Sequence, residues 1–254
     1  MRSNLNTISH FFRALRLLFR NCWFDTMDSE EYVRYLRSRG IKVGENVRFR
    51  YPGHTLIDKN RPTLVEFGDN IDINDNFTLL THDFGTYALR GKYRDFVNSS
   101  GRVRIGNNVV IGRDVTILKG VEIGDNTIIG LGAVVTKSTP PNSVIAGMPA
   151  RVVSSIDDYY KKRKDLQVEE ALEYAASIIV REKRELRIED FYEEWVLFLT
   201  EDEYNNNPKV RQFVDYRLGK YISKEAFFSQ KKHFNGFEEF VKATHEYLNK
   251  NCKK

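Results

Sequence analysis

Histidine is the residue type of this chain best suited to acid–base chemistry near neutral pH, and the chain has five. A neutral imidazole, with an unperturbed pKa near ~6.5, can take a proton from a hydroxyl group and return it to a leaving group. His82 stands apart because it begins a polar segment that interrupts a regular repeat. Asp83 follows it and could orient the imidazole, bind a substrate or be a solvated turn residue. The other histidines are read as surface or core residues, namely His10, His54, His233 and His245.

Cysteine chemistry is not expected. Cys22 and Cys252 lie near opposite ends of the 254 residues, so they form neither a disulfide framework nor a CxxC metal site. Neither lies in the repeat, which argues against a covalent cysteine intermediate. Because only His54 and His82 lie in the repeat region, a metal site of three converging histidines is also disfavoured, and we expect no metal.

The element that must position His82 is a six-residue repeat between Val103 and Lys137. One apolar series comprises Val103, Val109, Val115 and Val121, continued by Thr127 and Ala133, and the other comprises Ile105, Ile111, Ile117, Ile123, Ile129 and Val135. Glycine and then Asn or Asp follow the second series, and weaker copies occur at residues 43–47 and 67–73. An α-helix would repeat every 3.6 residues, so the pattern instead indicates short strands joined by tight corners, at which Gly, Asn and Asp tolerate left-handed backbone angles. Three such edges close a coil of about 18 residues, and stacked coils form a parallel β-helix.

Outside the repeat the pattern becomes helical. We expect an N-terminal helical segment over residues 1–40, a β-helix over 41–153 with a loop insertion at 83–102, and an α-helical C-terminal extension over 154–254. Within the extension, apolar stripes at residues 156–179, 188–199 and 237–248 predict three amphipathic helices. The extension is interpreted as packing surface rather than as a cofactor site. The fold class is therefore mainly β.

Charge is concentrated at the start of the chain. The formal net charge is +5, and residues 1–24 contain four arginines and no acidic residue, so the rest is close to neutral and nucleic-acid binding is not expected. No apolar run approaches the ~18 residues of a membrane span. Residues 8–24 form a basic amphipathic stretch that either caps the first coil or rests on an anionic membrane surface. No conventional signal peptide is recognised, and a cytoplasmic enzyme, with possible peripheral membrane contact, is expected.

The segments IGNNVVIGRDVTILKGVEIGDNTIIGLGAVVTKS (105–138) and VIAGMPARVV (144–153) resemble the hexapeptide-repeat acyltransferase family. The resemblance covers roughly residues 41–153 and is strongest to sugar O-acetyltransferases of the maltose, galactoside and nodulation-factor type. It implies a left-handed β-helix and a homotrimer, with acetyl-CoA in the groove between neighbouring subunits. One departure is Met148, which stands where the family usually has Asn in AGNPA.

The resemblance also implies roles for individual residues. His82 occupies the place of the family's catalytic base, and Asp83 becomes a candidate for binding or orienting the acceptor. Five positions match the family's contacts with acetyl-CoA, although Leu131 replaces the usual Ala: Arg113, Leu131, Thr136, Lys137 and Arg151.

The predicted function is therefore acetyl transfer from acetyl-CoA to a sugar hydroxyl, in a cell-surface polysaccharide or its precursor. Two alternatives remain open, namely N-acetylation of an amino sugar or nucleotide sugar, and a non-catalytic β-helical scaffold whose helical tail binds partners. A metalloenzyme of the carbonic anhydrase kind is disfavoured by the histidine count.

Overall fold

The computed structural model describes residues 26–219 and 221–251. It divides the chain into two compact units, Met1–Tyr159 and Tyr160–Lys254, which are described separately. None of the helices in the described ranges is long and apolar enough to cross a membrane. The basic stretch at residues 8–24, His10 and both cysteines lie outside those ranges.

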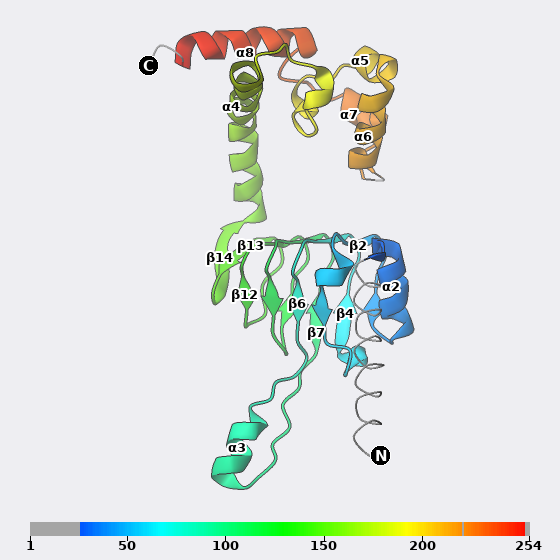
Figure 1. Cartoon of the computed structure of the whole chain (residues 1–254), viewed down its shortest axis with the longest axis vertical. Coiled ribbons are helices and arrows are strands. Elements are labelled where there is room, and N and C mark those ends of the chain that lie inside the picture. Colours follow the sequence, from blue (N-terminus) through cyan, green and yellow to red (C-terminus); the bar gives the residue numbers. More distant parts are fainter. Residues whose placement is uncertain (1–25, 220, 252–254) are drawn as a thin grey trace, which may run out of the picture. The chain divides into compact units, whose positions relative to one another are not determined.

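The first unit is a parallel β-helix, as the repeat predicts (Figure 1). Sheet A contains β1 (Lys42–Val43), β4 (Val65–Phe67), β7 (Val103–Ile105) and β10 (Glu122–Ile123). Sheet B contains β2 (Val47–Phe49), β5 (Ile71–Ile73), β8 (Val109–Ile111), β11 (Ile128–Ile129) and β13 (Ser143–Gly147), with β14 (Ala150–Ser155) antiparallel on β13. Sheet C contains β3 (Leu56–Ile57), β6 (Thr78–Leu79), β9 (Thr116–Ile117) and β12 (Val134–Val135). Successive coils add one strand to each sheet, and the apolar series of the sequence fill the core.

Each coil turns at three corners. In the coil that contains β7, β8 and β9, residues 106–108 form the A–B corner, residues 112–115 the B–C corner and residues 118–121 the C–A corner. At the A–B corner one asparagine per coil has a left-handed φ between 54° and 59°, as the sequence predicts for corner residues. Side-chain amides of successive coils bond at 2.8–3.4 Å along this asparagine ladder, which consists of Asn46, Asn70, Asn108, Asn126 and Asn142.

The corner glycines divide into two groups, because Gly120 and Gly132 have the expected left-handed φ, of 77° and 69°, whereas Gly106 and Gly124 at the A–B corner do not. Gly106 and Gly124 allow close approach of the next coil instead. A Cβ on Gly106 would lie 2.4 Å from Asp125 Oδ1, and a Cβ on Gly124 would lie 2.3 Å from the backbone nitrogen of Pro141. At the A–B corner asparagine therefore supplies the backbone angle and glycine supplies the space.

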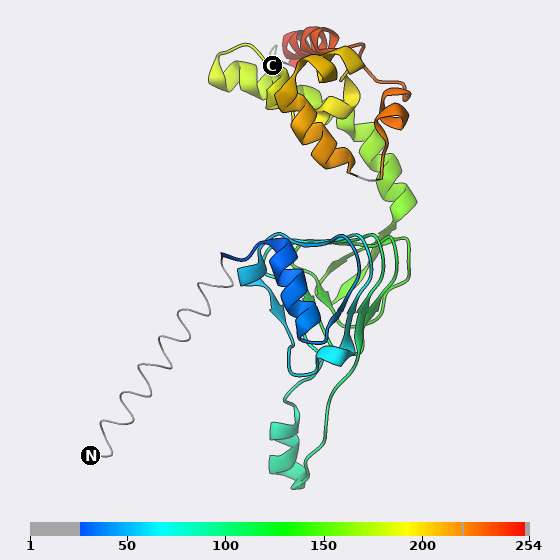
Figure 2. The ribbon, with the colours of Figure 1, turned by 90° about the vertical axis from the view of Figure 1, so that its right-hand side faces the viewer.

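Helix α2 (Ser29–Ser38) packs on β1 and β2, at the first coil (Figure 2). Asp28 and Glu31 cap its N-terminus reciprocally. Tyr32 and Leu36 are fully buried, and the Tyr32 ring meets Phe49 edge-on at 5.0 Å. Two short 3-10 turns, η1 (Pro52–His54) and η2 (Pro62–Leu64), lengthen the corners of the first coil.

The second unit is helical and has its own core. The core is centred on aromatic residues, with the rings of Phe198 and Phe240 stacked at 4.8 Å and Phe191 edge-on to Phe240 at 5.1 Å. Its elements are α4 (Ile156–Glu182, which begins in the first unit), η3 (Ile188–Asp190), η4 (Glu194–Leu197), α5 (Glu201–Asn206), α6 (Pro208–Leu218), α7 (Lys224–Phe228) and α8 (Phe237–Asn251).

The prediction of an α-helix over residues 188–199 is wrong. That stretch forms the two 3-10 turns η3 and η4. The consecutive residues Leu197, Phe198 and Leu199 are all buried, which a single face of an α-helix cannot achieve, since neighbouring positions point about 100° apart. Tertiary packing therefore overrides the helical pattern here.

Candidate functional site

His82 lies at the C–A corner, where an inserted segment, the arm (residues 83–102), leaves the β-helix and carries α3 (Thr86–Tyr93) at its far end (Figure 1). The Nδ1 atom of His82 is hydrogen-bonded to Oδ2 of Asp58. The pairing of β3 with β6 explains this contact, because it sets Ile57 beside Leu79 and so brings the segments that follow both strands together. The two side chains are only 13% and 3% exposed, so the pair is shielded from water.

The surroundings of Asp58 determine the tautomer of His82. Burial alone would raise the pKa of Asp58, but hydrogen bonds from Thr81, Asn60 and His82 together hold that pKa below its ordinary value. The Asn60 N–H donates to Oδ1 at 3.0 Å, and the Thr81 hydroxyl and N–H donate to Oδ2. An ionised carboxylate only accepts hydrogen bonds, so the proton is assigned to His82 Nδ1. The Nε2 atom then keeps a lone pair that can accept a proton.

Asp83 contacts both ends of the arm and the coil beyond it. Its carboxylate accepts hydrogen bonds from the Gly85 N–H at 2.8 Å and the Ser99 hydroxyl at 2.7 Å, and it pairs with Lys119 Nζ at 2.6 Å. Led by the Lys119 contact, these bonds hold the pKa of Asp83 far below its usual range. Since Ser99 lies at the other end of the arm and Lys119 in the next coil, the three residues fix the foot of the arm beside His82.

The arm exposes aromatic side chains close to the histidine. Phe84 is 68% exposed and meets the His82 ring edge-on at 5.0 Å. Tyr87 follows Phe84 at 6.1 Å and carries the Arg90 guanidinium over its ring. Tyr93 and Phe96 are also exposed. The side of His82 that faces the arm therefore offers apolar rings with polar tips.

A second histidine–carboxylate pair lies at the B–C corner, where the strands of sheet C begin, whereas His82 lies at the corner after they end. His54 Nδ1 bonds to Asp75 Oδ1 at 2.7 Å, and Arg113 Nη2 bonds to Oδ2 of the same carboxylate at 2.7 Å. The His54 bond first, and then the Arg113 charge, lower the pKa of Asp75. The carboxylate charge is thus shared with a guanidinium, whereas Asp58 pairs with no Lys or Arg among the described residues. His54 is also largely exposed, which makes it the weaker candidate for a base.

The five positions matched to acetyl-CoA contacts do not lie together in one chain. Arg113 and Leu131, which is 79% exposed, lie at the B–C corner, where the Gly132 N–H donates to the Arg113 carbonyl oxygen at 2.8 Å. Thr136 and Lys137 follow β12 at the C–A corner, the corner of His82, and both are exposed. Arg151 is exposed on β14. Within one chain the five positions are thus divided among the B–C corner, the C–A corner and strand β14 of sheet B.

Asp58 is the site residue that the sequence analysis missed. It lies 24 residues before His82 and outside the regular part of the repeat, because the first coil is lengthened by η2. The available signal was a carboxylate directly after the pair Leu56-Ile57, which lies beside Thr78-Leu79 in the next coil, a few residues before His82.

Known proteins share this β-helical part of the chain. The family model "Bacterial transferase hexapeptide (six repeats)" matches residues 102–137. Galactoside O-acetyltransferase of Escherichia coli (strain K12) is 37% identical over 145 residues, which are 56% of this chain and 68% of that protein. Protein CapG of Staphylococcus aureus is 34% identical over 179 residues, which are 70% of this chain and 95% of CapG. Among solved structures, a galactoside acetyltransferase in complex with coenzyme A is similar with 31% identity and a TM-score of 0.41, over 58% of this chain and 82% of that one.

The chain belongs to the bacterial hexapeptide-repeat transferase family. Its fold is accordingly a left-handed parallel β-helix with helical segments at both ends, as expected. It is an acyltransferase, which confirms the class of enzyme predicted from the sequence. Within the described residues, no group of three or more His, Cys, Asp or Glu side chains could hold a metal ion.

Proposed function

We propose that this enzyme transfers an acetyl group from acetyl-CoA to a hydroxyl group of a sugar, by direct transfer with His82 as general base. The observation that carries the proposal is the His82 imidazole, whose Nδ1 is held by the buried carboxylate of Asp58 at the foot of the arm. The relative named galactoside O-acetyltransferase supports a sugar hydroxyl as the acceptor.

The geometry suits such a reaction. His82 Nε2 removes the proton of the sugar hydroxyl while its oxygen attacks the thioester carbonyl carbon. The carbon–sulfur bond of the tetrahedral intermediate then breaks, and the imidazolium returns the proton to the departing thiolate of CoA. Asp58 stabilises the imidazolium between these steps, because its charge faces the ring from a site with little water. No covalent enzyme intermediate is needed.

The donor and the assembly are proposed together. Acetyl-CoA carries several phosphate charges, and the exposed cations Arg113, Lys137 and Arg151 suit them. Arg113 lies at the B–C corner and Lys137 at the C–A corner, so a homotrimer could set the C–A corner of one subunit beside the B–C corner of the next. A groove between subunits would then bring His82 and the full set of donor contacts together.

The acceptor is proposed to be a glycan of a cell-surface polysaccharide or its precursor, acetylated in the cytoplasm, where acetyl-CoA is available. The arm supports a large acceptor, because its exposed rings extend from Phe84 beside His82 to Tyr93 at the far end of α3. Asp83 would act indirectly, by holding the arm at the correct place.

The test is acetyl-CoA turnover, followed as release of free thiol, across sugars, amino sugars and glycan precursors. His82→Ala should lower kcat by roughly 10²–10⁴-fold. His54→Ala is the matched control, because it removes the other imidazole whose Nδ1 meets a carboxylate, and it should keep its kcat. Near-normal turnover of His82→Ala would remove this residue from the mechanism, and preference for amino sugars would indicate N-acetylation.

A further inference from the structure

The helical second unit contains a cavity of about 440 Å³ that plays no part in the proposed acetyl transfer. Its floor consists of the buried side chains of Trp195, Leu218 and Phe227, with the Trp195 and Phe227 rings 5.0 Å apart. Four further apolar side chains line it while remaining 40–66% exposed, namely Tyr160, Tyr192, Val196 and Ile222. The volume lies in the range of small-molecule sites, which is ~300–1,000 Å³.

The charges around this cavity are unbalanced. Arg217 pairs with Glu193 at 3.0 Å, so these two lining residues neutralise each other. Lys164, Lys231 and Lys232 also line the cavity, and none of them forms an ion pair with any residue that the structure describes. The cavity therefore combines apolar walls with three uncompensated cations.

Lys232 is the most constrained of these cations. Its Nζ lies 3.0 Å from the centre of the Phe227 ring and donates to the Phe227 carbonyl oxygen at 3.0 Å. Burial first, and then the nearby charge of Lys164, lower the pKa of Lys232 to about 8. The Phe227 ring attracts this ammonium, but burial and the second cation disfavour its charge, and a bound anion would offset that cost.

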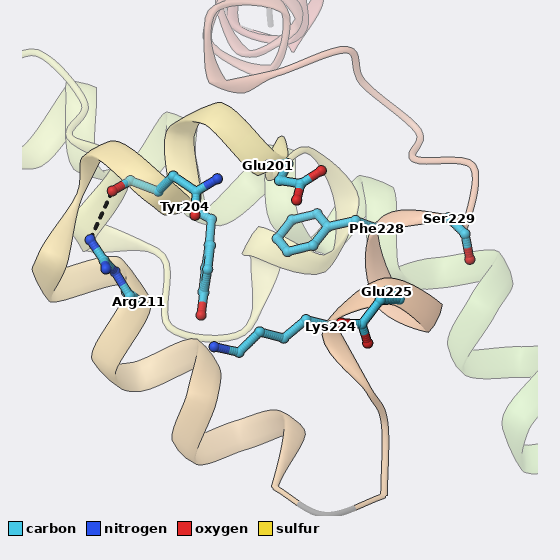
Figure 3. Close-up of a pocket in the computed structure, with 8 residues that line it drawn as sticks. Glu201, Tyr204, Arg211, Lys224, Glu225, Phe228 and Ser229 are labelled. Atoms are coloured by element: carbon cyan, nitrogen blue, oxygen red, sulfur yellow. Dashed lines mark hydrogen bonds between the residues drawn. The ribbon is translucent and has the colours of Figure 1, made fainter.

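A neighbouring cavity shows the contrast. It measures about 560 Å³, and Tyr204 stands in it between Arg211 and Lys224 (Figure 3). There Lys224 pairs with Asp215 at 3.1 Å, and Arg211 donates to the Asn205 carbonyl oxygen at 2.8 Å. Because Lys224 has a carboxylate partner and Glu201 and Glu225 also line this second cavity, its cations are balanced by acidic groups and no anion is expected there.

We propose that the cavity around Trp195 and Lys232 binds a phosphorylated small molecule that carries an apolar group. The phosphate would join Lys164, Lys231 and Lys232, and the apolar group would cover Trp195, Phe227 and the exposed side chains at the rim. Both an isoprenoid phosphate and a nucleoside diphosphate have this chemistry. The site is independent of the proposed acetyl transfer, so either proposal can fail alone.

Tryptophan fluorescence provides the test on the full-length chain. The chain has two tryptophans, so Trp23→Phe leaves Trp195 in the floor of the cavity as the single reporter. The probes are farnesyl pyrophosphate, UDP and inorganic pyrophosphate. We expect farnesyl pyrophosphate or UDP to bind about ten-fold or more tighter than pyrophosphate, because only they also cover the apolar walls. Tighter binding of the first would identify an isoprenoid ligand, and of the second a nucleotide.

Variants of the lining cations complete the test. Lys164→Gln and Lys232→Gln should each weaken binding by about ten-fold, the effect of losing one charged hydrogen bond. Lys242→Gln on α8, an exposed lysine that does not line the cavity, is the matched control and should bind normally. In Lys232→Gln the kcat for acetyl transfer should be unchanged. Absence of binding, affinity no better than for pyrophosphate, or unchanged affinity in both lining variants would overturn the proposal.

Discussion

Replacing Asp58 by Asn tests the central claim about the site, that a buried carboxylate makes His82 a competent base. The substitution keeps the shape of the side chain and an oxygen that can accept the Asn60 N–H bond, so the fold should survive. It removes the negative charge that faces the imidazole. An amide can also donate to Nδ1, which would move the ring proton to Nε2 and block the base.

The magnitude follows from the bond that is lost. A hydrogen bond to a charged group contributes about 1.5–3 kcal/mol, and each ~1.4 kcal/mol is a factor of ten in rate, so kcat/KM should fall by about 10- to 150-fold. The charge that is removed is present throughout the neutral range, since hydrogen bonds hold the pKa of Asp58 below its ordinary value.

The assay is thiol release from acetyl-CoA, measured from pH 5 to 9 with the acceptor identified by the substrate panel. Asp75→Asn is the matched control, because it makes the same change at the pair formed with His54. It should preserve kcat. If Asp58→Asn has a normal rate, or if both variants lose kcat equally, the assignment of Asp58 and His82 is refuted.

Three further predictions concern stability and order. Asn108→Ala should lower the free energy of unfolding in urea by about 2–3 kcal/mol, because it loses ladder bonds and places Ala at a φ of 56°. Asn108→Gly should lower it less, because glycine adopts this φ without strain. Equal losses in the two variants would contradict the claim that the left-handed φ contributes to the cost. Asp83→Asn should speed hydrogen exchange at residues 84–98, because the contact with Lys119 is lost. Since the pKa of Asp83 is lowered in the folded state, this contact is complete above about pH 4 and is lost only as the pH falls toward the folded-state pKa. Unchanged exchange in the variant would count against this anchor. Lys232→Met should raise the melting temperature at pH 7, because folding lowers the pKa of Lys232 from 10.5 to about 8 and so makes its charge unfavourable. This gain in melting temperature should shrink as the pH rises from 8 to 10.5. A gain independent of pH would show that the charge is not the cause.

Much of the fold could be predicted from the sequence because each coil of the β-helix repeats the same short pattern of residue types. Each coil uses the same residue types at the same places, so Val109, Ile111 and Ile117 could be assigned to the core without knowing the rest of the structure. The helical unit lacks such repetition. Its burial is set by contacts between distant segments, as with Phe191 and Phe240, and the pattern at residues 188–199 was therefore misread.

Only part of the candidate site could be predicted from the sequence, for the same reason. His82 was visible because it interrupts the repeat, but its partner depends on the register between β3 and β6. Asp83 stands next to His82 in the sequence, but the contacts of its carboxylate are with Lys119 and Ser99. Adjacency along the chain was thus a poor guide, and adjacency between coils was the relevant one.

A stack of identical coils has no intrinsic length, since its last rung offers unsatisfied N–H and C=O groups to any further strand, including one from another molecule. In this chain a different element follows at each end of the stack. Helix α2 packs on β1 and β2 of the first coil with Tyr32 and Leu36 buried, and β14 runs antiparallel on β13, so it changes the direction of pairing in sheet B at the last coil. At these strands the added elements oppose the end-to-end addition of a further parallel coil.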